Sequence, residues 1–115
     1  MPRLSAWSAL ASFRHILRAF GVAGGEVTLR FMPNGLGIRS THMRTRIEGS
    51  YFDYYGGANV VVKLLAADVL NLVHNWGDDE IITLQLDSDR TRLVCTYEAE
   101  DRSYVRVRGI IYLSA

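Results

Sequence analysis

Two segments of the chain carry apolar side chains at the spacing of an α-helix. The apolar stripe of the first segment consists of Leu10, Phe13, Ile16, Leu17 and Phe20. This spacing predicts a helix over residues 9–20. Ser8 is suited to cap the N-terminus of this helix, and Gly21 is suited to end it.

The second segment fits the helical template at every apolar position. Its apolar stripe consists of Val69, Leu72, Val73 and Trp76, and its polar side consists of Asp68, Asn71, His74 and Asn75. The pattern predicts an amphipathic helix over residues 67–76, with Gly77 as the residue that ends it.

The remaining apolar positions mostly alternate with polar ones, which is the period of a half-buried β-strand. We predict strands over residues 4–7, 27–31, 36–39, 43–54, 60–64, 81–87, 92–98 and 104–113. Gly49 is expected to interrupt the fourth of these strands as a bulge or a break. The order of elements predicts an α+β fold, with two helices packed on one face of antiparallel sheets.

Composition supports one domain spanning residues 1–115. An apolar content of 49% is sufficient for a single core. The only cysteine, Cys95, lies in an alternating run and is expected to be a buried strand residue in a reducing compartment. No apolar run reaches the ~20 residues that a membrane span requires. These features predict an intracellular protein that does not interact with a membrane.

The charged and histidine side chains do not predict a catalytic or metal site. His15, His42 and His74 lie on different elements, without the spacing of metal ligands. The acidic run 78–80 fits a turn between a helix and a strand, and Gly35-x-Gly37 lies in a hairpin. We therefore expect no enzymatic activity, no metal and no cofactor. A net charge of +1 does not by itself indicate nucleic-acid binding, so the positions of the charges must decide.

Several segments, taken in order, resemble one protein family. They are Gly35-Leu36-Gly37-Ile38-Arg39-Ser40, Tyr51-Phe52-Asp53-Tyr54-Tyr55, the gap-free stretch from Val69 to Leu84 with its Asp78-Asp79-Glu80-Ile81-Ile82-Thr83-Leu84, and Leu93 to Ala99. Together they are similar to a domain of DNA sliding clamps of the proliferating-cell-nuclear-antigen type. The likeness covers residues 13–107. A subunit of that family has two such domains, so the resemblance implies that the second domain and the interdomain connector are missing here.

The resemblance implies that the helices face duplex DNA. In the family, basic side chains on these helices line the inside of a ring. Arg14 and His15 match such positions, Arg18 stands where the family commonly has an acidic residue, and Asn71 and His74 stand where it often has lysines. The candidate DNA-binding residues are therefore Arg14, His15, Arg18, Asn71 and His74. Contacts of this kind are independent of base sequence and sensitive to salt. The alternative is that Arg14 and Arg18, which share one helix face, are ordinary solvated residues.

Two further surfaces follow from the resemblance. Partner peptides of clamps bind beside the loop that matches residues 40–43, so His42 and Met43 are candidate partner-binding residues; an ordinary loop is the alternative. The last strand pairs across the subunit boundary in clamps. The candidate interface residues are therefore Tyr104, Val105, Arg106, Val107 and Arg108. A solvated edge strand is the alternative there.

The sequence thus leads to one expected function and two alternatives. The expectation is a sliding-clamp-like processivity or scaffold protein for DNA replication or repair, in which six single-domain chains form a ring by head-to-tail assembly. Its partners would be double-stranded DNA, further copies of itself, and DNA polymerase or other clamp-binding proteins. It would be nuclear in a eukaryote and otherwise cytoplasmic. The alternatives are a truncated clamp domain, or an interaction module that does not encircle DNA.

Overall fold

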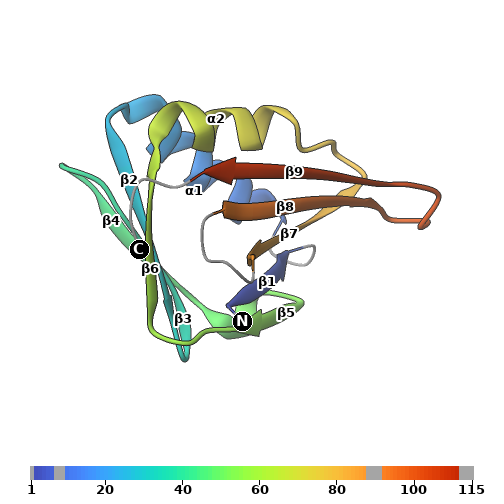
Figure 1. Ribbon diagram of the computed structural model, residues 1–115, viewed down its shortest axis with the longest axis horizontal. Coiled ribbons are helices and arrows are strands. Elements are labelled where there is room, and N and C mark those ends of the chain that lie inside the picture. The colour runs from blue at the N-terminus through green and yellow to red at the C-terminus, as the bar shows by residue number, and fades with distance from the viewer. Residues whose placement is uncertain (1, 7–9, 88–91, 112–115) are drawn as a thin grey trace.

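The computed structural model describes residues 2–6, 10–87 and 92–111, which form two helices and two β-sheets (Figure 1). The helices are α1 (Leu10–Ala23) and α2 (Ala66–His74), and a short 3-10 turn covers Gly49–Tyr51. The strands are β1 (Arg3–Ala6), β2 (Glu26–Met32), β3 (Gly35–Arg39), β4 (Arg44–Glu48), β5 (Tyr54–Gly56), β6 (Val60–Leu65), β7 (Glu80–Leu86), β8 (Arg92–Ala99) and β9 (Val105–Ile111).

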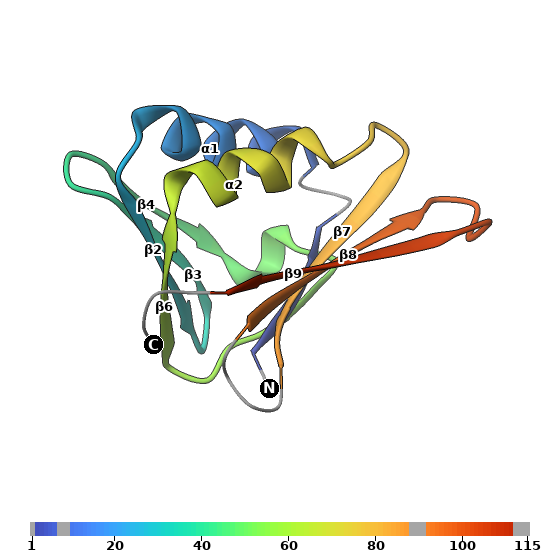
Figure 2. The same ribbon diagram turned by 45° about the horizontal axis from the view of Figure 1, so that its top comes forward.

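Both sheets are antiparallel. One has the strand order β5-β1-β7-β8-β9, and the other has the order β4-β3-β2-β6. The two helices lie side by side on one side of the sheets, as Figure 2 shows. The predicted α+β class, with two helices and antiparallel sheets, is confirmed.

A single hydrophobic core joins the helices to both sheets. In β7 and β8 every second residue is buried, which is the pattern of strands with one face on a core. Phe13 of α1 lies at the centre of an aromatic group and contacts the rings of Phe52 and Trp76, with centroid distances of 5.2 and 6.0 Å. This contact joins α1 to two segments that are distant from it in the sequence.

The prediction that Gly21 ends the first helix is wrong. Helix α1 continues to Ala23, and the residue after it, Gly24, has the positive φ of 81° that a helix-ending glycine adopts. Gly21 instead lies where α1 crosses α2: a Cβ atom there would be 3.0 Å from both the Cβ and the backbone nitrogen of Leu70. The predicted cap at Ser8 lies outside the described residues.

The segment predicted as one strand over residues 43–54 is divided between the two sheets. Strand β4 ends at Glu48, the 3-10 turn follows, and β5 then pairs with β1 in the other sheet. The hydroxyl of Tyr55 lies within hydrogen-bonding distance of the carbonyl oxygens of Met32 and Gly35, so it ties this crossover to the β2–β3 turn. Gly49 therefore marks a break, at which the chain changes sheets, and not a bulge.

Helix α2 is shorter than predicted at its C-terminal end. It stops at His74, and Trp76 follows outside the helix but is still buried. The indole nitrogen of Trp76 donates to the carbonyl oxygen of Glu80 at 2.8 Å, which fixes the loop between α2 and β7. The apolar period identified Trp76 as a core residue correctly, although the helix ends before it.

Candidate functional site

Four of the five predicted DNA-binding residues are exposed on the helix layer. His15 and Arg18 lie on α1, and Asn71 and His74 lie on α2. Because the two helices are neighbours, their exposed stripes form one surface, which we call the helix face (Figure 2). Arg18 is the only arginine or lysine among these four.

Arg14, the fifth predicted residue, is held inside the chain. Its guanidinium donates hydrogen bonds to the carbonyl oxygens of Trp76 at 2.8 Å and Gly77 at 3.0 Å. It also lies 4.5 Å from the centre of the Trp76 ring and 3.4 Å from a carboxylate oxygen of Asp78. Only 17% of its side chain is exposed. The Arg14 guanidinium therefore stabilises the loop after α2. A contact between Arg14 and DNA stays a prediction.

The loop over residues 40–43 forms a polar hollow at the end of the β3–β4 hairpin. The hollow has a volume of about 420 Å³, and its lining includes Arg39, His42 and Arg44. His42 is exposed, whereas Met43 is half-buried and packs against the core. Because the Met43 side chain packs against the core, His42 is the more accessible of the two predicted partner-binding residues.

Strand β9 is an edge strand with exposed apolar side chains. Its inner edge pairs with β8, and no other described strand pairs with its outer edge. Val105 and Val107 are 53% and 67% exposed, and the preceding residue Tyr104 is 47% exposed. Exposed edges of this kind can accept another strand by β-augmentation.

The two arginines of β9 lie on the opposite face from the valines, and Arg106 is engaged within the chain. Its guanidinium donates to both carboxylate oxygens of Glu80, at 2.6 and 3.1 Å, and to the carbonyl oxygen of Asn75 at 2.7 Å. It lies 4.8 Å from the centre of the Tyr97 ring. Arg106 thus pairs with the buried carboxylate of Glu80 at the edge of the core. A role of Arg106 at a subunit interface stays a prediction.

Glu80 is the buried partner in this pair, and sequence reasoning missed it. Burial alone would raise the pKa of its carboxyl, but hydrogen bonds from Arg106, the Gly77 N–H and Tyr104 outweigh burial and lower it. A signal was present in the sequence, because Glu80 has the same strand parity as the inward residues Ile82 and Leu84. A carboxylate at an inward position requires a cationic partner.

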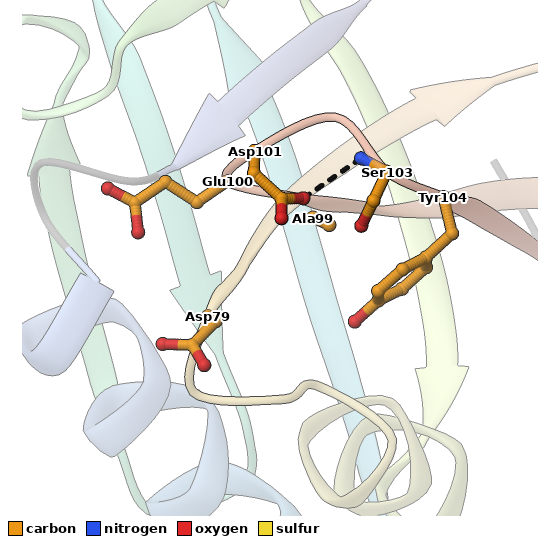
Figure 3. Close-up of a pocket in the computed structure, with 6 residues that line it drawn as sticks. All are labelled: Asp79, Ala99, Glu100, Asp101, Ser103 and Tyr104. Carbon is orange, nitrogen blue, oxygen red and sulfur yellow. Dashed lines mark hydrogen bonds between the residues drawn. The ribbon is translucent and has the colours of Figure 1, made fainter.

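An acidic pocket lies beside this pair. It has a volume of about 500 Å³, and Figure 3 shows its lining residues Asp79, Ala99, Glu100, Asp101, Ser103 and Tyr104. The Asp101 carboxylate accepts a hydrogen bond from the Ser103 N–H at 2.9 Å. Across the described ranges, no group of three His, Cys, Asp or Glu side chains is arranged to hold a metal ion.

Cys95 does not have the properties of a nucleophile. It is fully buried in β8, and burial raises the pKa of its thiol to about 12, so the thiol stays protonated at neutral pH. The expected absence of catalytic chemistry stays a prediction for the whole chain.

Comparison with known proteins adds no family assignment. No family model matches the chain, and no curated protein matches it. Among the described helices, none is long and apolar enough to cross a membrane. The likeness to sliding clamps therefore rests on the residues quoted in the sequence analysis.

Proposed function

We propose that this chain is a clamp-type domain of a sliding-clamp-like processivity or scaffold protein for DNA. The observation that carries the proposal is the combination of a helix pair on one side of two antiparallel sheets with the exposed edge of β9. This combination is what a subunit needs if it presents helices to DNA and joins its neighbours through strand edges.

Head-to-tail assembly requires two different edges that can pair with each other. The outer edge of β9 belongs to the five-stranded sheet, and β4 is an edge strand of the four-stranded sheet. Pairing β9 of one copy with β4 of the next would continue a sheet across the boundary through main-chain hydrogen bonds, with Val105 and Val107 on one face of the joined sheet. Repetition of this contact with a closing rotation would give a ring of six domains.

DNA would lie against the helix face in this arrangement. Arg18 provides a guanidinium group, and His15, Asn71 and His74 provide polar groups beside it. One arginine per domain, with the Asp68 carboxylate on the polar side of α2, gives weak contacts with phosphates that carry no base specificity. Such contacts suit a protein that tracks along duplex DNA, including one that holds a polymerase there.

A second candidate is a clamp-derived interaction module that never encircles DNA. The observation that favours it is the position of Arg14, which is held by Trp76 and Gly77 and leaves the helix face with few accessible cations. A domain excised from a longer clamp subunit would behave in the same way. These candidates differ from the ring in one property, which is topological retention on closed DNA.

Retention on circular DNA tests the proposal. The chain is mixed with nicked circular plasmid while dilute and then concentrated, so that rings can assemble around the DNA without a loading protein. We expect the protein to stay on the circle through a wash and to leave when a restriction enzyme linearises the plasmid. Arg18→Glu should reduce retention, and Arg102→Glu, on the exposed β8–β9 turn, is the matched control. Equal loss from circular and linear plasmid would exclude encirclement and favour the interaction module.

A further inference from the structure

The outer face of the four-stranded sheet carries more positive charge than the helix face. Its five cations, all exposed, are Arg30, Arg39, Arg44, Arg46 and Lys63. We call this surface the basic sheet face. The register aligns Lys63, Thr28, Arg39 and Arg44 in one row across the strands, and Arg30, Gly37 and Arg46 in the next row. Residues from four β-strands, β2, β3, β4 and β6, therefore form one patch.

The charge on this face is not balanced within the described part of the chain. Arg39 lies directly opposite Arg44, and like charges in such a pair destabilise a sheet. Of the five cations, only Arg46 has an ion-pair partner among the described residues: Glu48, at 3.6 Å. The other carboxylate that the described residues place on this face is Glu26, which pairs with Leu65 in the row next to that of Lys63. The basic sheet face thus holds a net charge of about +3, although the whole chain carries only +1.

The size and shape of the patch suit an extended polyanion. The patch spans three strand spacings, which is about 14 Å across the strands, and two residues along a strand, which is about 7 Å. Gly37 has no side chain of its own between Arg30 and Arg46, and the aliphatic stem of Arg30 lies against it, so the two guanidinium groups share this row without a third side chain from β3. At one end, Arg39 and Arg44 also line the polar hollow of about 420 Å³ together with Ser40 and Thr41.

The side chains on this face favour phosphate over a protein or a single strand. Protein interfaces rely on buried aromatic and apolar anchors, and single-stranded nucleic acid is bound by stacking on aromatic rings. Leu65, at a corner, is the only large exposed apolar side chain that the described residues place on this face. Four of the five cations are arginines, whose planar donors match the oxygens of a phosphate.

We propose that the basic sheet face binds the phosphate backbone of a nucleic-acid duplex without reading its sequence. This surface is separate from the helix face, and its binding does not depend on a ring. A clamp-type domain with both surfaces would contact a second stretch of duplex on its outside.

Salt-dependent binding to a short duplex tests this proposal. The probe is a fluorescein-labelled blunt DNA duplex of arbitrary sequence, followed by anisotropy, with an RNA duplex of the same sequence as a parallel arm to identify the source of the phosphates. Five phosphate contacts predict a slope of log K against log salt of about −4.5, which is a loss of about 500-fold between 50 and 200 mM salt. For Arg39→Gln/Arg44→Gln, three contacts predict a loss of about 40-fold over the same range.

The matched control is Arg3→Gln/Arg102→Gln, which removes two exposed arginines outside the face and should keep the wild-type slope. A slope that is the same for Arg39→Gln/Arg44→Gln and the wild type would overturn the proposal. Stronger binding to poly-glutamate or to a single strand than to the duplex would overturn it too. A short duplex with open ends cannot retain a ring, so this result is independent of retention on circular plasmid.

Discussion

The carboxylate of Glu80 is almost fully buried and depends on the guanidinium of Arg106, which reaches it from the edge strand β9. Burial disfavours its ionised form, but the hydrogen bonds of Arg106 and the Gly77 N–H reverse the effect, so the pKa of Glu80 is lowered in the folded chain. Ionised Glu80 therefore stabilises the fold at pH values above its ordinary pKa of 4.5. This stabilisation is lost as the pH falls through the lower folded value.

Replacing Glu80 with Gln should reveal this dependence. We expect Glu80→Gln to lower the free energy of unfolding by about 2 kcal/mol at pH 7, because charged hydrogen bonds contribute more than neutral ones and the guanidinium is half exposed. The difference from the wild type should shrink as the pH falls below 4.5. Urea unfolding at a series of pH values measures it. A difference that stays constant down to pH 3 would contradict the assigned ion pair.

Substitutions of Arg14 test whether its hydrogen-bond geometry or only its charge stabilises the fold. We expect Arg14→Ala to lower the free energy of unfolding by about 2 kcal/mol, because the carbonyl groups of Trp76 and Gly77 lose their donors. Arg14→Lys should restore little of this, since an ammonium group lacks the planar fork that reaches both carbonyls. Arg18→Ala, on the exposed side of α1, is the control and should be neutral in thermal unfolding. Full recovery by Lys would show that charge alone matters at this position.

Arg14 and Glu80 show which features of the site could not be predicted from the sequence. Helical spacing correctly separated exposed positions such as Arg18 and His74 from the core. It could not identify the partners of Arg14, because they follow it by more than 60 residues and come near it only through the packing of α1 on α2. For Glu80, strand parity contained the information, but the acidic run around it suggested an ordinary turn.

At the scale of elements, the closest contact between α1 and α2 depends on Gly21. A Cβ atom at this position would meet the backbone of Leu70 at 3.0 Å, and backbone cannot move aside as a flexible side chain can. We expect Gly21→Ala to lower the free energy of unfolding by about 1–3 kcal/mol, although alanine favours a helix over glycine. Thermal unfolding measures the change, and Val22→Ala at the exposed neighbouring position is the control. A stabilised Gly21→Ala variant would show that the helices are not packed this closely.

The elements themselves were largely predictable, and their connections were not. Apolar periodicity identified both helices and located the strands to within a few residues, because burial imposes the same period on any core-facing element. Periodicity did not distinguish a glycine that ends a helix from one that lets two helices pack closely, because Gly21 interrupts the apolar pattern in either case. It also could not divide residues 43–54 between two sheets, because alternation does not specify which strand is the partner.

At the scale of the whole molecule, the chain separates charges that nearly cancel in its composition. The basic sheet face gathers five cations on one side, whereas Asp79, Glu100 and Asp101 line the acidic pocket beside β9. A net charge of +1 hides this division. The strand register brings Arg39 next to Arg44, and this register cannot be read from the composition. Both proposed nucleic-acid surfaces therefore follow from the arrangement of elements and not from composition.

The proposed ring requires that copies of this domain join through the outer edge of β9. Light scattering coupled to size-exclusion chromatography, over a range of concentrations, measures the mass directly. We expect a species of about six times the 12.9 kDa of one chain. Val105→Lys/Val107→Lys, which places charges on the exposed edge, should reduce it to a single chain. A wild-type mass of one chain at every concentration, or a hexamer that survives both substitutions, would contradict the claim.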